Sequence, residues 1–280
     1  MFKPTNGNEL KVKNDYNIDC KKIVEKDKHT IYTAIDFDCL GLDTFPKPGD
    51  APINIFSIVE PTKKFCFVDI LRNENNPSMK EFEANIKKFY RFLNTLKYFS
   101  DFVFFIDFVD SEEELIREYW MLQRAISADV SLSWGGFDVE YPALIKRMEK
   151  LNIDKSIACD DEFKRTVLEM VEDETHEAID HYDRKRFLSC MAKTEYRDQL
   201  VDYINSHRGC TPPESFMLCD VMKHETDFKY DMNTVNIVDI RTLPYKHFKE
   251  FVFGTIEASI AQYVLDTKLK SKETIIKDME

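Results

Sequence analysis

Glycine is scarce in this chain, with 7 residues in 280, and no glycine-rich phosphate loop is present. This excludes the classes of protein that bind nucleotides through such a loop. The seven cysteines include no Cys-x-x-Cys pair, which is typical of reduced thiols inside a cell and fits no standard zinc site. Without an apolar N-terminal segment or a run of about eighteen apolar residues, we expect neither secretion nor a membrane span. The sequence therefore favours an intracellular protein, in the cytoplasm of the host cell if its source is viral.

Positive charge is also in deficit. The chain has 39 Lys and Arg against 51 Asp and Glu, and its net charge is −12. This argues against a protein that coats duplex DNA through a broad basic face, but it does not exclude an enzyme that holds a strand end through metal ions. The 43% hydrophobic and 13% aromatic content is typical of a globular chain.

The order of strand and helix patterns predicts the fold class. Apolar and alternating segments indicate strands at 31–40, 53–61, 64–71, 101–109 and 128–134. Helical periodicity indicates helices at 78–99, 110–127 and 135–151, and a long helix within 235–271. Asp110 is a plausible N-cap for the helix at 110–127. Because strands and helices follow one another, we expect an α/β fold with a mixed sheet and helices packed on it.

Two further segments bear on the domain organisation. Residues 1–30 are polar and Lys-rich, and we interpret them as a short arm or the remnant of an N-terminal domain. Residues 31–280 then form one domain. Its stretch at 154–208 is densely charged, and we expect a helical insertion there.

Two acids stand in the first predicted strand, Asp36 and Asp38. Side chains alternate along a strand, so both carboxylates point to the same face. In a chain with 51 acidic residues this spacing arises often by chance, and a solvated strand end is the simpler interpretation. The alternative is a bound cation, because like charges held together in a strand need a partner.

Three motifs that include these acids follow one another along the chain. The first is Asp36-Phe37-Asp38 with the loop "FPKPGDAPI" after it, the second is "SWGGFDVEYP" with Asp138, and the third runs from Phe253 to Glu257. In this order they resemble the acidic motifs of the 3′–5′ exonuclease domain of family B DNA polymerases, particularly the phage type. The resemblance covers most of residues 31–270 and fails over about 155–200.

The resemblance implies an RNase H-like fold and a proofreading function in DNA replication, the hydrolysis of single-stranded DNA 3′ ends. It implies two Mg²⁺ or Mn²⁺ ions, since such ions stabilise the attacking and leaving oxygens and take oxygen ligands. Asp36 would bridge both ions. Asp38 and Glu257 would hold the ion that binds the attacking water, and Asp138 the other. Without metal, we expect repulsion among the four carboxylates to raise at least one pKa.

Several motif positions depart from the family. Asp38 stands for a Glu and Glu257 for an Asp, and Phe253 stands for a Tyr whose hydroxyl contacts the attacking water. Gly135 and Gly136 replace a turn that carries an Asn after the Trp. The departures leave two functions open: an active metal-dependent exonuclease, or a weakened exonuclease-like module that binds DNA ends or is a structural subunit of a split polymerase.

The expected partners are a single-stranded DNA 3′ end and a chain or domain that carries the polymerase palm. We expect Phe45 and Trp134 to contact unstacked bases, although Phe45 fits the core of its loop equally well. No later segment offers the aspartates of a palm. A stand-alone exonuclease, a subunit of a split polymerase and a piece of a longer polymerase all stay open.

Overall fold

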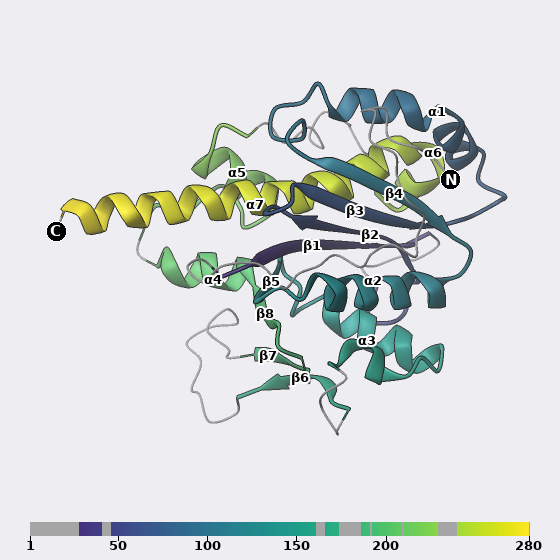
Figure 1. The fold of residues 1–280 in the computed structure, drawn as a ribbon, viewed down its shortest axis with the longest axis horizontal. Coiled ribbons are helices and arrows are strands. Elements are labelled where there is room, and N and C mark those ends of the chain that lie inside the picture. Colours follow the sequence, from purple (N-terminus) through teal and green to yellow (C-terminus); the bar gives the residue numbers. More distant parts are fainter. Residues whose placement is uncertain are drawn as a thin grey trace.

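The computed structural model describes residues 28–40, 46–160, 166–173, 186–190, 192–208, 210–228 and 240–279. A six-stranded sheet of order β4-β3-β2-β1-β5-β8 runs through its middle (Figure 1). The strands are β1 (Thr30–Phe37), β2 (Ile53–Glu60), β3 (Phe65–Leu71), β4 (Val103–Val109), β5 (Val130–Ser133) and β8 (Glu195–Asp198). Most are rich in Ile, Val and Phe, as suits strands covered on both faces.

Strand directions make this sheet mixed. β2 is antiparallel to both β1 and β3. β4 is parallel to β3, while β5 is parallel to β1 and β8 to β5. The antiparallel centre with parallel edges confirms the predicted α/β class with helices on a mixed sheet, and it is consistent with an RNase H-like fold.

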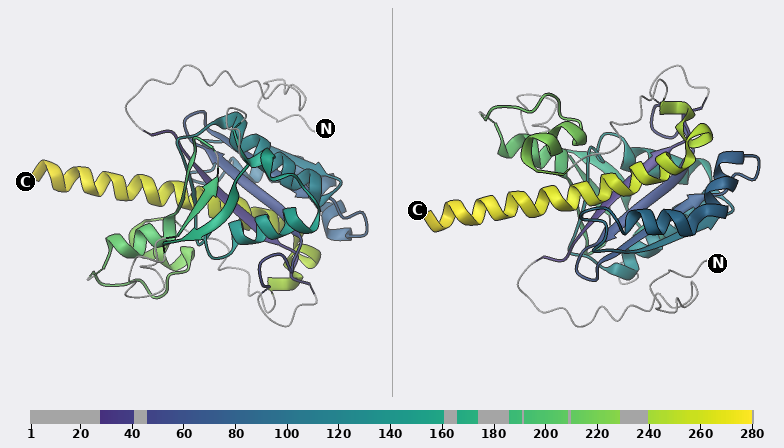
Figure 2. Two further views of the ribbon diagram at one scale, coloured as in Figure 1. Left: turned by 90° about the horizontal axis from the view of Figure 1, so that it is seen from below. Right: turned by 90° about the horizontal axis from the view of Figure 1, so that it is seen from above.

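Helices cover both faces of the sheet (Figures 1 and 2). One face carries α1 (Pro77–Leu93), α5 (Leu218–Glu225), α6 (Leu243–Lys246) and α7 (Phe248–Met279), and the other carries α2 (Glu112–Ile126) and α3 (Glu140–Lys150). The short helices η2 (Lys155–Ala158), α4 (Gln199–Ser206) and η5 (Ile240–Thr242) complete the described set. The N-cap of α2 is Ser111, one residue after the predicted Asp110, because the Ser111 hydroxyl accepts from Glu114 N at 3.1 Å. Within the described ranges, no helix is both long enough and apolar enough to cross a membrane.

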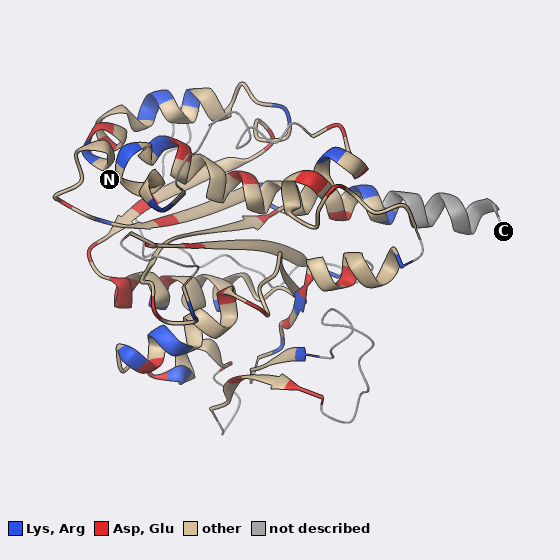
Figure 3. Ribbon diagram, turned by 180° about the vertical axis from the view of Figure 1, so that it is seen from behind, with Lys and Arg blue, Asp and Glu red and all other residues tan. Residues whose placement is uncertain are grey.

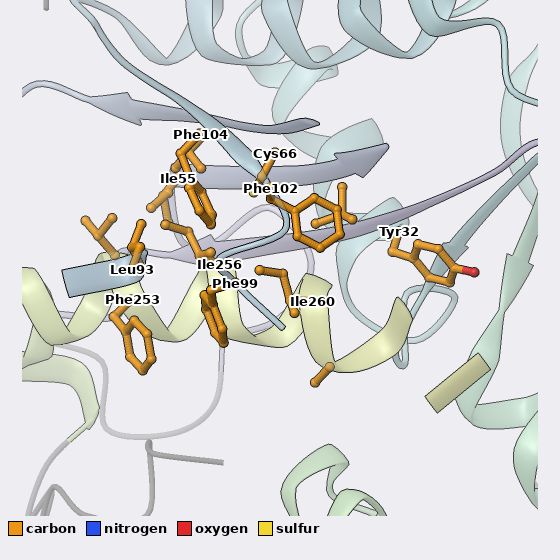
Figure 4. Packing of buried hydrophobic residues seen from close by; sticks show 14 of the residues in the cluster. Tyr32, Ile55, Cys66, Leu93, Phe99, Phe102, Phe104, Phe253, Ile256 and Ile260 are labelled. Atoms are coloured by element: carbon orange, nitrogen blue, oxygen red, sulfur yellow. The ribbon is translucent and has the colours of Figure 1, made fainter. Parts of the chain in front are cut away.

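β1 divides its side chains between two hydrophobic cores. Tyr32 joins the core beneath α1, α5 and α7, whereas Ile31 and Ile35 join the core beneath α2 and α3. Figure 4 shows the first core, where Ile256 of α7 lies among aromatic rings and strand residues. The alternation places Asp36 on the side of α7.

The rotation of α7 about its axis is fixed by polar side chains on its sheet-facing side. Ser57 in β2 donates its hydroxyl to the Thr255 carbonyl at 2.8 Å and lies 2.8 Å from the Ser259 hydroxyl. Gln262 donates its amide to the carbonyl of Thr33 at 2.9 Å. Residues 255, 259 and 262 share one face of an α-helix, so this face of α7 lies on β1 and β2.

The prediction of a helical insertion at 154–208 is wrong for three described segments. β6 (Leu168–Glu172) and β7 (Arg186–Cys190) form an antiparallel two-stranded sheet, and the last segment is β8. Only η2 and α4 are helical among the described residues there. The physical reason is that these short strands bury few side chains, among them Leu168 and Leu188, so charge dominates the local pattern. The predicted arm and domain limits stay predictions, and residues 1–27 lie outside the described residues.

Candidate functional site

The carboxylate of Asp36 lies near the end of β1, under α7. Its Oδ2 accepts a hydrogen bond of 2.6 Å from the hydroxyl of Thr255. Burial raises the pKa of Asp36, and the Thr255 hydrogen bond lowers it in part. The expected rise in pKa is therefore present, but burial causes it rather than repulsion from the other three predicted ligands.

Glu257 follows Thr255 by two residues on α7. Two residues turn an α-helix by about 200°, so Glu257 leaves the helix on a different side from the residue that contacts Asp36. Its side chain is buried, with 1% of the residue exposed. The residue of α7 that contacts the first carboxylate by a hydrogen bond is thus Thr255.

Asp38 lies on the same face as Asp36, one strand period further on. Its Oδ2 accepts from the hydroxyl of Tyr245 in α6, and its Oδ1 accepts from the backbone N–H of Leu40 at 3.1 Å. Burial, and then the hydrogen bond to Asp38, raise the pKa of Tyr245 to about 12. The Tyr245 hydroxyl is therefore a donor to this carboxylate at neutral pH.

Asp138 follows β5 and is paired with a cation from the protein itself. The guanidinium of Arg186, at the start of β7, donates to Asp138 Oδ1. The two side chains are 13% and 30% exposed, so the pair is partly shielded from water. Asp138 also lines a small hollow with Phe37 and Lys47. Its charge is thus already balanced by Arg186, which lies 48 residues further along the chain.

The turn before Asp138 depends on its two glycines. Gly135 has φ +72°, and a Cβ on Gly136 would lie 1.9 Å from the Ser133 hydroxyl. Asp198 at the end of β8 accepts from the backbone N–H groups of Gly135 and Phe137, both at 3.0 Å. A side chain at position 136 would therefore displace Ser133 at the end of β5, and the positive φ of Gly135 favours glycine.

Phe253 lies in the hydrophobic core and not at the rim of an acidic cleft. Its ring stacks on Phe99 with centroids 5.4 Å apart and an angle of 18°, and it also contacts Phe92 (Figure 4). Trp134 is half-buried, and its indole N–H donates to the carbonyl of Phe216 at 3.3 Å. Phe45 lies outside the described residues.

Glu140 is a site residue that sequence reasoning missed, together with Thr255, Tyr245 and Arg186. Its Oε1 accepts from the backbone N–H of Ile35 at 3.0 Å, which ties the start of α3 to β1. Burial, and then the charge of Asp36, hold the pKa of Glu140 well above its ordinary range. The sequence shows an acid two residues after Asp138, but it shows neither the burial of this acid nor its contact with β1.

The predicted metal ligands do not gather in this arrangement. Among the described residues, no group of three or more His, Cys, Asp or Glu side chains is placed to hold a metal ion. Asp36, Asp38 and Asp138 each accept from a different protein donor, as described above. The donor set therefore does not fit two divalent ions, and the ligand roles stay predictions. In the view of Figure 3, acidic and basic residues are interspersed over the described elements.

Comparison with known proteins identified no relative of this chain. No protein-family model matches the chain, and no curated protein matches it either. Any function inferred for this chain therefore rests on its fold and on the contacts of the site residues described above.

Proposed function

We propose that this chain is an exonuclease-like module that binds single-stranded DNA 3′ ends for a polymerase of family B type and does not hydrolyse them. The palm of that polymerase would belong to another chain or domain. The observation that supports the proposal is the hydrogen bond of 2.6 Å from the Thr255 hydroxyl to Asp36, the carboxylate that the resemblance expects to bridge both ions.

The chemistry explains why this contact matters. Two-metal hydrolysis requires carboxylates that neutralise both ions and hold them about 3.5–4 Å apart. A threonine hydroxyl carries no negative charge, and the Thr255 hydroxyl donates its hydrogen bond to Asp36. Arg186 balances the charge of Asp138, the acid of the second motif. Both features lower the attraction for divalent cations.

The test combines DNA hydrolysis with DNA binding. The purified chain is incubated with end-labelled single-stranded DNA and Mg²⁺ or Mn²⁺, and binding of the same DNA is measured by fluorescence anisotropy. We expect binding without shortening that EDTA can stop. Thr255→Asp introduces a carboxylate beside Asp36, and a gain of EDTA-sensitive shortening in this variant alone would support the proposal further. EDTA-sensitive shortening by the natural chain, lost in Asp36→Ala, would overturn it.

The second candidate is an active proofreading exonuclease. It is favoured by Asp36 and Asp38, which share one face at the end of β1 beside α6 and α7. Bound Mg²⁺ or Mn²⁺ would supply charge stabilisation at the scissile phosphate. The two candidates differ in one outcome of the test above: only the second predicts EDTA-sensitive shortening of DNA by the natural chain, which Asp36→Ala abolishes.

A further inference from the structure

Two cysteines lie where the β6–β7 pair joins the rest of the chain. Cys159 follows η2 and is buried, and Cys190 is the last residue of β7 and is partly buried. The Cys190 thiol donates to the carbonyl of Ala158 at 3.0 Å, and the Cys159 thiol lies 3.5 Å from the carbonyl of Val167. Cys190 thus contacts the backbone of the residue that precedes Cys159.

The register of the β6–β7 pair brings the second thiol to the first. Cys190 pairs with Leu168, the residue that follows Val167. Each thiol therefore lies against backbone that is next to the other cysteine or next to its strand partner. Burial, and then the charge and the hydrogen bond of Cys159, raise the pKa of the Cys190 thiol. The hydrogen bonds, the strand register and this pKa agree that the two sulfur atoms are neighbours.

The chain on either side of these thiols is held by further hydrogen bonds. The backbone N–H of Lys193 donates to the carboxylate of Asp160 at 2.8 Å, and the hydroxyl of Thr194 donates to the carbonyl of Ala128 at 2.8 Å. The two cysteine-bearing segments are thus fastened to each other and to the chain before β5. A bond between cysteines held in this way requires rotation of side chains rather than movement of the hairpin.

We propose that Cys159 and Cys190 form a redox modification site, at which a small-molecule disulfide such as oxidised glutathione converts the two thiols into an intramolecular disulfide bond. The inference goes beyond the proposed function and does not depend on it. The structure shows the reduced state, with both cysteines free.

The oxidation proceeds by two thiol–disulfide exchanges. Cys190 is the more exposed residue, and its thiolate attacks one sulfur of the glutathione disulfide, whose S–S bond breaks. The Cys159 thiolate then attacks the Cys190 sulfur of the mixed disulfide, and the second glutathione leaves. The two protons of the cysteines pass to the two departing glutathione thiolates, and two electrons reduce the glutathione disulfide. Because the pKa of Cys190 is raised, we expect the first exchange to be slow.

Oxidation would reinforce the contact between β7 and Asp138. Arg186, Leu188 and Cys190 share one face of β7 because side chains alternate along a strand. Leu188 on this face is buried, whereas Phe187 on the other face is exposed. The disulfide would therefore fasten the face of β7 whose first residue, Arg186, donates to Asp138.

The first test uses the natural chain. The reduced protein is equilibrated with oxidised and reduced glutathione, its remaining thiols are blocked with N-ethylmaleimide in denaturant, and its peptides are analysed by mass spectrometry without reduction. We expect a peptide pair joined through Cys159 and Cys190, with the loss of two hydrogen atoms. Glutathione adducts on the exposed Cys210 without this pair, or a pair that forms only in urea, would overturn the proposal.

Two serine variants and a matched control test the order of the exchanges. Cys159→Ser is expected to stop at the glutathione adduct of Cys190, and Cys190→Ser is expected to form no link. Cys210→Ser removes an exposed cysteine and is expected to link like the natural chain, while thermal unfolding shows whether each reduced variant is folded. A link from Cys190 to some other cysteine in Cys159→Ser, at the rate of the natural chain, would contradict the assigned pair.

Amide hydrogen exchange measures the effect on β7. We expect exchange of the backbone amides of residues 187–190 to slow by about tenfold when the natural chain is oxidised, and to stay unchanged in Cys159→Ser under the same buffer. Equal exchange in the oxidised and reduced natural chain would overturn the inferred reinforcement of this strand. DNA takes no part in these measurements, so failure of this proposal and failure of the proposed function are observed separately.

Discussion

At the scale of single residues, Thr255 and Tyr245 determine how the strand acids are held. Each donates a hydroxyl to one carboxylate, Thr255 to Asp36 and Tyr245 to Asp38. The bond from Thr255 lowers the pKa of Asp36, although burial raises it by more. This answers the problem posed by two acids on one face of a strand: their partners are hydroxyl groups of the last two helices.

The packing of Phe253 gives a prediction at this scale. Phe253→Tyr restores the hydroxyl of the family motif but places it between Phe92 and Phe99. We expect the free energy of unfolding to fall by about 1–3 kcal/mol, measured by urea denaturation, with no gain of DNA hydrolysis. Phe187→Tyr is the control, because Phe187 is 47% exposed. Unchanged stability together with EDTA-sensitive hydrolysis would place the Phe253 ring at the site instead.

At the scale of elements, a few buried charged groups connect strands to their neighbours. Glu60 at the end of β2 accepts from His29 Nε2 at 2.8 Å, before β1, and from the backbone N–H groups of Thr62 and Lys63. Arg186 of β7 reaches Asp138 after β5. These contacts fix the β2–β3 turn and the position of the β6–β7 pair.

The pH dependence of stability tests the first of these contacts. Burial raises the pKa of Glu60, but the bonds from His29 and Lys63 outweigh it, so the folded pKa is below the ordinary value. A lowered pKa stabilises the fold above the unfolded pKa of about 4.3, and this contribution is lost as pH falls through the folded pKa. We expect Glu60→Gln to cost about 1–3 kcal/mol at pH 7 and progressively less below pH ~4. The exposed Glu113→Gln is the control, and a cost for Glu60→Gln that grows towards acid pH would contradict the account.

A double-mutant cycle tests the second contact. Arg186→Gln and Asp138→Asn each remove one partner, and we expect a coupling energy of roughly 1–2 kcal/mol between them. The pair Arg197 and Asp202 is 45% and 43% exposed and is expected to couple more weakly, because water screens it. Coupling near zero for Arg186 and Asp138 would mean that the guanidinium does not balance this carboxylate in solution.

At the scale of the whole molecule, the sequence predicted the sheet better than the site. Strong alternation and apolar runs located β1 to β5, and helical periodicity located α1 to α3. The rotation of α7 was not predictable, because its residues from Phe251 to Leu265 are buried on nearly all sides and no apolar stripe shows which face lies on the sheet. The spacing from Phe253 to Glu257 equals that from Phe251 to Thr255, and only packing distinguishes them.

Divalent cation binding tests the central claim, that Asp36 is held by Thr255 and not by metal ions. The direct measurement is an anomalous difference map from crystals of the natural chain soaked in Mn²⁺. The account predicts no peak within about 2.2 Å of the Asp36 carboxylate, with the Thr255 hydroxyl still on Asp36. A Mn²⁺ peak shared by Asp36 and either Asp38 or Asp138 would contradict it.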